Sequence, residues 1–375
     1  MKRTKLTIIG LLAAMALIIG ACGDDSDSGS GDGGSGSGSD DVVKAAWIYV
    51  GPINDGGWTT AHDEGRKYVE EQLGDKVETT YKENVPEGPE TLQVIEDLIK
   101  DGNDIIFATS FGFGAAMVEA AAEHPDVKFE WATGPDSAVS DNVAVYFGAG
   151  EDSIYLSGMA AGAATKNGTI GFVAPFPIPE VIRHINAYAL GAQKVNPDAK
   201  VKVVWMNSWF APDKERQAAE SLIAEGADVI ANGGDSPAPG EAAKAKNIPW
   251  TGYDSDQSEN FPEIWLTAAV YDWGPYYLER VQAVIDGNWK TGNYYGDMSD
   301  GFTDLAPFGK IVSAETQAAI EAEKERLIAT PQAEFTGPLL DQDGNEKVPA
   351  GTQMTNEELQ VMDWFVQGVE GSAKG

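Results

Sequence analysis

The chain has 375 residues and carries 59 acidic against 26 basic side chains, for a formal net charge of −33. Such an acidic chain is a poor ligand for nucleic acid and is not drawn electrostatically to an anionic lipid surface. Its length is sufficient for two domains, and its single cysteine excludes an intramolecular disulfide.

The N-terminus has the pattern of a secretion signal. Three basic residues precede an apolar run over 6–19, which is too short for a comfortable membrane span. The run ends in Ile-Gly-Ala-Cys, which resembles the lipobox of bacterial lipoproteins, where the cysteine becomes the lipidated first residue. We therefore expect a signal peptide over 1–21 and a lipid anchor at Cys22, on the extracytoplasmic face of the cell membrane.

The segment after Cys22 is expected to be a tether. Residues 23–41 contain only Gly, Ser and Asp. A tract without apolar side chains cannot bury enough surface to fold and behaves as a flexible coil. We expect the lipidated cysteine and this tract, 22–41, to hold a folded part away from the membrane.

Short apolar runs rich in β-branched and aromatic residues alternate with longer amphipathic runs from residue 43 to 330. The expected strands are 46–50, 77–81, 105–109, 128–132 and 143–147, then 169–174, 202–206, 229–231, 249–253 and 264–270. The expected helices are 60–73, 88–101, 114–123, 153–165, 180–196, 211–225 and 238–247. This alternation predicts right-handed βαβ units and parallel sheets, and two successive sets predict an α/β protein of two similar lobes.

The chain is expected to divide between the lobes as follows: a first part of the N-terminal lobe over 42–150, the C-terminal lobe over 151–270, a return to the N-terminal lobe over 271–300, a third crossover with a helix over 301–330, and a tail over 331–375. Aromatic residues in the tail suit it to packing on a lobe.

The loop after the first expected strand is the leading candidate for ligand contact. In open parallel sheets, ligands bind beyond the carboxyl ends of the strands. Here that position offers Asn54 and Asp55 as hydrogen-bonding groups and Trp58 as a ring that could stack on a planar solute. The alternative is a surface turn in which Asp55 caps the next helix and Trp58 packs into the core.

Further candidates fall on or near other expected strand ends. Ser110, Asp235 and Asp254 could converge there and read the polar edge of a ligand. Asp235 could instead cap the helix that follows it. Phe111 could be a core residue on the hinge side, and Trp273 could either line a cleft or pack behind the tryptophan of the first loop.

Several motifs, in their order along the chain, resemble the basic membrane protein family of lipid-anchored substrate-binding proteins of ABC transporters. They are INDGGW at 53–58, TSFGFG at 109–114, EDSIYLSGMAAG at 151–162, TGYDSDQ at 251–257, LTAAVYDWG at 266–274 and the tail from Phe335. The resemblance implies the type I periplasmic-binding-protein fold, two Rossmann-like lobes with parallel sheets joined by a hinge. It also implies a purine base or nucleoside as ligand, a membrane permease as partner, a monomer, and no cofactor or metal.

The resemblance also implies site residues. Asp55 and Trp58 match the acid and aromatic of the family's first loop. Trp209 matches the stacking ring of the second lobe, with Phe210 as the alternative, and Asp254 matches the acid that contacts ribose. Tyr271 stands where many nucleoside binders have a lysine. This departure favours a free base, adenine first, over a nucleoside.

Binding is then expected to proceed by hinge closure: a purine stacks on one lobe and the other closes over it. A ligand favours the closed form only through its extra contacts there. Replacing either stacking tryptophan, Trp58 or Trp209, by alanine should weaken binding roughly tenfold.

Enzyme motifs fit the chain poorly. His62, His124 and His184 stand without partners at metal or triad spacing, and each is expected on the surface. Neither a P-loop nor a complete dinucleotide fingerprint is present. Two alternatives stay open: a nucleoside hydrolase using Asp254 and Asp256 as a carboxylate pair, and a ligand sensor with the same binding chemistry but a receptor as partner.

Overall fold

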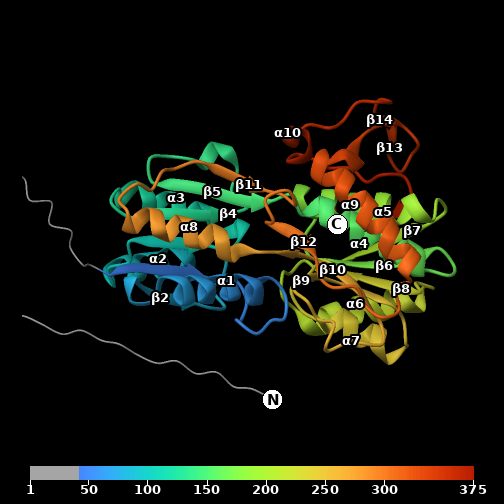
Figure 1. Cartoon of the computed structure of the whole chain (residues 1–375), viewed down its shortest axis with the longest axis horizontal. Helices are drawn as coiled ribbons and strands as arrows, with labels where there is room; N and C mark the ends of the chain where they lie inside the picture. The colour runs from blue at the N-terminus through green and yellow to red at the C-terminus, as the bar shows by residue number, and fades with distance from the viewer. Residues whose placement is uncertain (1–41) are drawn as a thin grey trace, which may run out of the picture. The chain divides into compact units, whose positions relative to one another are not determined.

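The computed structural model describes residues 42–375, which form two α/β lobes, each built on its own sheet (Figure 1). The expected signal peptide, the lipidation site at Cys22 and the tether lie outside the described residues. Within 42–375, no helix combines the length and the apolar character that crossing a membrane requires.

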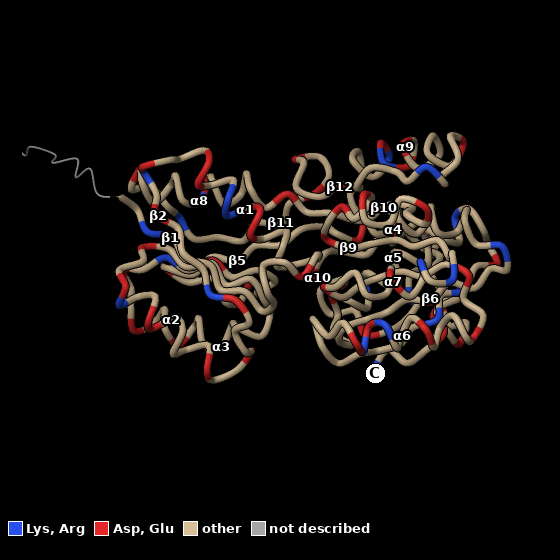
Figure 2. The backbone as a smooth tube through the Cα atoms, turned by 90° about the horizontal axis from the view of Figure 1, so that it is seen from below, with Lys and Arg blue, Asp and Glu red and all other residues tan. Residues whose placement is uncertain are grey.

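The first lobe contains a parallel sheet in the order β11-β5-β4-β3-β1-β2. Its strands are β1 (Val43–Ile48), β2 (Val77–Lys82), β3 (Ile105–Ala108), β4 (Lys128–Ala132), β5 (Val143–Gly148) and β11 (Asn293–Gly296), and its helices are α1 (Trp58–Leu73), α2 (Glu90–Lys100), α3 (Gly114–Glu123) and α8 (Trp273–Ile285). Helices α1 and α8 cover one face and α2 and α3 the other (Figure 2). Central strands covered on both faces are apolar along their whole length, which explains the unbroken apolar runs in the sequence.

The second lobe contains a sheet in the order β12-β10-β9-β8-β6-β7-β15, in which only the β10–β12 pair is antiparallel among the described strands. Its strands are β6 (Thr169–Ala174), β7 (Lys200–Trp205), β8 (Val229–Asn232), β9 (Trp250–Asp254), β10 (Trp265–Tyr271), β12 (Thr303–Leu305) and β15 (Val369–Glu370), and its helices are α4 (Gly150–Ala164), α5 (Pro179–Val195), α6 (Pro212–Ala224), α7 (Ala238–Ala245) and α9 (Ala314–Ala329).

The chain passes between the lobes after β5, after β10 and after β11. Gly150 and Tyr271 lie where the first two of these crossings meet. A Cβ at Gly150 would stand 1.9 Å from the Tyr271 hydroxyl oxygen, so only glycine allows the crossings to approach this closely. Helix α4, which follows the first crossing, packs closely on α5. A Cβ at Gly191 of α5 would lie 1.9 Å from the carbonyl oxygen of Tyr155 of α4, so the missing side chain at Gly191 permits this approach.

The tail packs on the second lobe. It contains the β13 (Leu339–Leu340) and β14 (Glu346–Val348) hairpin and the short helix α10 (Asn356–Leu359), and it ends in β15 beside β7. Phe335 and Phe365 are buried in the core of that lobe. The side chain of Asn186 on α5 donates to the Trp364 carbonyl and accepts from the Val366 N–H, both at 2.9 Å.

Candidate ligand-binding site

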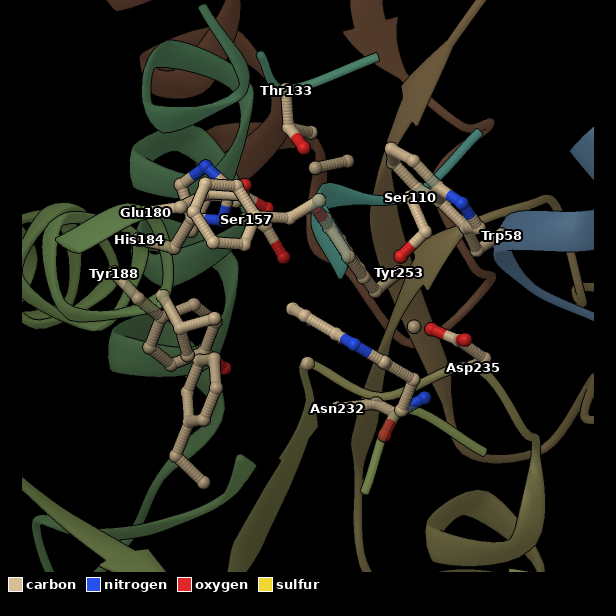
Figure 3. Close-up of a pocket in the computed structure, with 18 of the residues that line it drawn as sticks. Trp58, Ser110, Thr133, Ser157, Glu180, His184, Tyr188, Asn232, Asp235 and Tyr253 are labelled. Atoms are coloured by element: carbon tan, nitrogen blue, oxygen red, sulfur yellow. The ribbon is translucent and has the colours of Figure 1, made fainter. Parts of the chain in front are cut away.

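A cavity lies between the two lobes, beside the carboxyl ends of their strands. It is lined mainly by apolar and aromatic side chains with a few polar groups among them, the usual composition of a site for a small molecule. Figure 3 shows Trp58 and Asp235 on one side of it and Glu180 and His184 on the other. Of the residues predicted from the sequence, the structure brings five into the cavity wall: Trp58, Ser110, Phe111, Trp209 and Asp235.

Trp58 forms part of the first-lobe wall. It is the first residue of α1, and only 8% of its surface is exposed. Its indole N–H donates to the Thr109 carbonyl at 2.6 Å, and its ring lies edge-on to Trp273 at 5.4 Å. The polar atom of the ring is therefore already paired within the lobe, and the ring offers the cavity an apolar surface.

Trp209 faces the cavity from the second lobe, in the loop between β7 and α6. Its half-buried ring packs edge-on against Phe176 at 5.1 Å. Its carbonyl accepts the backbone N–H of Asp235 at 3.1 Å, so the loops that follow β7 and β8 are tied together. The aromatic ring and the acid consequently enter the cavity from one connected surface.

Asp235 is a buried acid without a partner. It follows β8, is 4% exposed, and has an enclosed carboxyl oxygen that receives no hydrogen bond from the described residues. Burial first, and then the charges of Asp55 and Asp254, raise the pKa of the Asp235 carboxyl well above its ordinary value. A buried polar group left unpaired is costly, so this carboxyl is suited to a ligand that donates hydrogen bonds.

The first loop contributes less to the cavity than its sequence suggests. The Asp55 carboxylate accepts the N–H groups of Gly57, Thr59 and Thr60, each at 2.9 Å. Four N–H groups at the start of a helix lack intrahelical partners, and an acid here satisfies them. Asp55 thus caps the start of α1 with its side chain, from two residues before the N-cap Gly57, which was one of the two roles that the sequence left open. Asn54 is exposed outside the cavity wall.

Trp273 and Asp254 also lie outside the cavity wall. Trp273 is 1% exposed and stacks on His62 at 4.1 Å and on Tyr271 at 5.2 Å, behind the ring of Trp58. Asp254 ends β9 with a left-handed backbone (φ 66°), and both of its carboxyl oxygens are enclosed without a hydrogen-bond partner among residues 42–375.

The expectation that the histidines are surface residues is wrong for two of them. His62 is fully buried on the inner face of α1, with its Nδ1 2.6 Å from the Tyr277 hydroxyl. His184 is 4% exposed and lines the cavity. Their sequence neighbourhoods show no sign of this, because the elements that cover them come from distant parts of the chain. His124 is half-buried and pairs with Glu96 at 2.9 Å.

Sequence reasoning missed the wall that α5 provides. Glu180 and His184 both line the cavity, and they stand four residues apart, so they share one helix face. The His184 Nε2 has no hydrogen-bond partner among the described residues, and burial, assisted by Arg183, lowers the pKa of its ring well below the ordinary value. The available signal was an acid and a histidine at this spacing in a helix that follows a strand end.

Comparison with known proteins decides the family. A model of ABC transporter substrate-binding proteins, PnrA-like (Bmp), matches residues 42–334. The chain belongs to this family. It is accordingly a substrate-binding protein of ABC transport and not an enzyme, which removes the nucleoside-hydrolase alternative.

Two relatives and one solved structure illustrate the match. The purine-binding protein BAB2_0673 of Brucella abortus is 42% identical over 88% of this chain and 94% of its own. The putative ABC transporter glucose-binding protein TsgA13 of Haloferax volcanii is 38% identical over 88% of this chain and 81% of its own. The crystal structure of ABC transporter system solute-binding proteins from Aeropyrum pernix K1 covers 85% of this chain and 97% of its own, with 17% identity and a TM-score of 0.69. The expected type I periplasmic-binding-protein fold is confirmed.

Glu180 gives this Bmp-family protein a distinct dependence of stability on pH. Burial raises the pKa of the Glu180 carboxyl from 4.5 to about 7, against the opposing effect of Arg183. The folded protein thus retains a proton that the unfolded chain loses above pH 4.5, so this contribution to stability falls as pH rises to 7. Glu180→Gln imitates the protonated form and should match wild type near pH 4.5. As the pH rises from 4.5 to about 7, the stability of the variant relative to wild type should increase by at most about 1.4 kcal/mol per pH unit.

Thermal unfolding of both proteins from pH 4.5 to 8 tests this expectation. Other buried groups titrate over the same range, so the informative quantity is the difference between variant and wild type at each pH. A difference that stays constant with pH would contradict the raised pKa of Glu180.

Proposed function

We propose that this protein captures a purine in the cavity between its lobes, with a free base such as adenine preferred to a nucleoside. The observation that carries the proposal is the combination of Trp58 and Trp209, from opposite lobes, with the unpaired carboxyl of Asp235 in one cavity. Aromatic rings stack on the faces of a base with roughly 1–3 kcal/mol each, and a carboxyl can accept from the amino edge. The name of the Brucella relative supports the same ligand class.

The preference for a free base rests on Tyr271, whereas the charge of the cavity wall disfavours anionic ligands such as nucleotides. By resemblance to the family, Tyr271 stands where many nucleoside binders have a lysine. It lies outside the wall, with its hydroxyl 3.3 Å from that of Tyr253. The described residues of the wall include the acids Glu180 and Asp235 but no lysine or arginine. Such a wall favours a neutral or protonated base rich in donors and disfavours anionic ligands.

We propose the other residues predicted from the sequence as further contributors to the ligand site. Ser110 and Phe111 belong to the wall, whereas Asn54, Asp55, Asp254 and Trp273 would act from behind it or from its rim.

In the cell, we propose lipid anchoring at Cys22 and delivery of the ligand to the permease of an ABC importer. Closure of the lobes on the ligand would present the surface that the permease recognises. A ligand sensor with a receptor as partner would use the same cavity, and a neighbouring permease gene would favour the importer.

Calorimetric titration of the protein, with residues 1–21 removed and Cys22 replaced by serine, tests the ligand class. The ligands are adenine, guanine, hypoxanthine and their nucleosides, with ribose as control and with glucose because of the name of the Haloferax relative. We expect the tightest binding for adenine and weaker binding for adenosine. Nucleosides binding as tightly as bases would remove the preference drawn from Tyr271. Binding of glucose and of none of the purines would show that the ligand is a sugar and not a purine.

Trp209→Ala should weaken adenine binding roughly tenfold or more, since one stacking surface is lost. Trp209 is half-buried, so its truncation should leave the unfolding temperature close to that of wild type. Trp58 is 8% exposed, and its truncation should also cost about 3 kcal/mol of stability. Titration together with thermal unfolding separates the two effects, and unchanged affinity in both variants would contradict stacking.

A further inference from the structure

Glu87 makes hydrogen bonds to both lobes. It lies in the first lobe, in the loop between β2 and α2. Its Oε1 accepts the Ser110 hydroxyl and, at 3.0 Å, the backbone N–H of Gly112. Its Oε2 accepts the indole N–H of Trp209, in the second lobe, at 3.2 Å. One carboxylate therefore connects the loop after β3 with the cavity ring of the opposite lobe.

The carboxylate is seated closely against Gly112. A Cβ at Gly112 would lie 2.5 Å from the Glu87 Cδ and 2.6 Å from its Oε1, so glycine at this position leaves the room that the carboxylate occupies. The loop that carries Glu87 is itself fixed. Val85 is 5% exposed and donates its N–H to the Tyr49 carbonyl at 3.0 Å, and the Thr91 hydroxyl donates to the Pro86 carbonyl at 2.8 Å. Although the side chain of Glu87 is exposed to solvent, hydrogen bonds hold the backbone before and after it in place.

The Trp209 ring depends on this carboxylate for its polar contact. Within residues 42–375, the indole N–H of Trp209 makes no other hydrogen bond. Other contacts across the lobes, from Ser255 and Gln257 to the Gly56 carbonyl, involve the first loop and no ring of the cavity wall. The Glu87 contact differs from these contacts because it involves the ring that we propose to stack on the ligand.

We propose that Glu87 is a positioning residue for the ligand, which fixes the plane of the Trp209 ring over the cavity once the lobes have closed. This inference rests on the proposed function of Trp209 as a stacking ring. Because the donor and the acceptor belong to different lobes, the hydrogen bond forms only in the closed form. Its loss should therefore mainly increase the rate at which ligand leaves.

The test compares Glu87→Ala with Glu83→Ala. Glu83 is a matched control: an exposed glutamate of the same loop that accepts a backbone N–H, from Ile53 at 2.9 Å, within the first lobe. Glu87→Ala should weaken adenine binding roughly 5- to 20-fold, the lower end of the effect of a hydrogen bond to a charged group because Glu87 is exposed. Most of the change should be in the dissociation rate. Glu83→Ala should remain within about twofold of wild type by the same measure.

A double-mutant cycle separates positioning from a general structural effect. Trp209→Phe keeps an aromatic face but removes the N–H, so both variants lose the contact between Glu87 and Trp209. Glu87→Ala also loses the contacts with Ser110 and Gly112, which lie within the first lobe. The double variant should bind little more weakly than Trp209→Phe alone. Additive losses, or a Glu87→Ala affinity within twofold of wild type, would overturn the proposal.

A readout without ligand distinguishes this inference from the proposed function. After Cys22→Ser the chain has no cysteine, so spin labels can be placed at single cysteines replacing Asp126 and Lys246, which are exposed in the two lobes. Because the hydrogen bond between Glu87 and Trp209 joins the lobes, it also favours the closed form without ligand. The fraction of short distances in the ligand-free protein should therefore be smaller in Glu87→Ala than in wild type. If wild type binds no purine, the proposed function fails. Equal distributions in wild type and Glu87→Ala would then overturn the role of Glu87 independently.

Discussion

Asp235→Asn is expected to lower the affinity for adenine by roughly 100-fold while leaving the fold intact. The wild-type residue is 4% exposed and has an enclosed carboxyl oxygen that receives no hydrogen bond from the described residues. Donors on the ligand favour the charged form of this carboxyl against the effect of burial. A hydrogen bond to a charged group contributes about 1.5–3 kcal/mol, and a mispaired buried group adds a penalty. Asparagine has the same shape as aspartate, but an NH₂ donor replaces one acceptor oxygen and would face a donor on the edge of the ligand.

Stability separates this effect from damage to the lobe. Burial and the neighbouring acids Asp55 and Asp254 already disfavour the charged carboxylate of Asp235. The neutral amide relieves that repulsion, and the backbone N–H at this position still reaches the Trp209 carbonyl. The unfolding temperature of the ligand-free variant should therefore equal or exceed that of wild type.

Titration and thermal unfolding of Asp235→Asn, beside Asp213→Asn, provide the measurement. Asp213 is an exposed acid on α6 of the same lobe, and its amide variant should bind as wild type does. Undiminished affinity in Asp235→Asn would mean that the ligand does not use this carboxyl, and the proposed purine edge contact would have to be abandoned.

Much of the fold could be predicted from the pattern of apolar residues. The predicted bounds of β4, β6 and α3 agree with the structure to the residue. Where the bounds differ, tertiary contact decides. β1 begins at Val43 rather than at residue 46, because Val43 and Lys44 pair with β2. α4 begins at Gly150 rather than at residue 153, because that glycine lets the helix start against Tyr271.

The candidate site could be predicted where topology alone places the residue. Ser110, Trp209 and Asp235 each follow a parallel strand, and the carboxyl ends of such strands meet at one edge of a sheet, so they reach the cavity. Asp55 also follows a strand, but local geometry decides its role: its carboxylate accepts the N–H of Gly57, just before α1, and two N–H groups of the first turn of α1. Topology predicts the neighbourhood of such a side chain and not its hydrogen-bond partners.

The α5 wall of the cavity and the contact of Glu87 lay beyond sequence reasoning for a different reason. Both arise from the way the lobes pack together, with Glu180 on a helix beside the crossings and Glu87 122 residues away from its partner Trp209. An isolated glutamate in a loop is indistinguishable from any solvated acid until the opposite lobe is in place.

Gly57→Ala should weaken adenine binding at least roughly 50-fold by preventing complete closure. Gly57 belongs to the loop before α1 in the first lobe, and a Cβ there would lie 2.5 Å from the Asp235 carbonyl oxygen and 2.9 Å from its carbonyl carbon, in the second lobe. These are backbone atoms in the loop after β8 and cannot rotate away, so the lobes would have to separate. Separation removes contacts that the ligand makes only in the closed form, and stacking on one ring alone accounts for about 1–3 kcal/mol.

Gly292→Ala is the matched control, because it also lies in a first-lobe loop and a Cβ there would meet no atom within 4 Å. Titration gives the affinities, and small-angle scattering with saturating adenine should show a larger radius of gyration for Gly57→Ala than for wild type or Gly292→Ala. Wild-type affinity together with a wild-type radius in Gly57→Ala would show that binding does not require this close approach of the lobes.

The clash involves backbone of both lobes and no ligand atom, so its effect should be the same for every ligand that needs closure. The loss in Asp235→Asn should instead depend on the donors at the edge of the ligand. Comparing the two variants across the purine panel therefore separates what closure contributes from what the edge contact contributes.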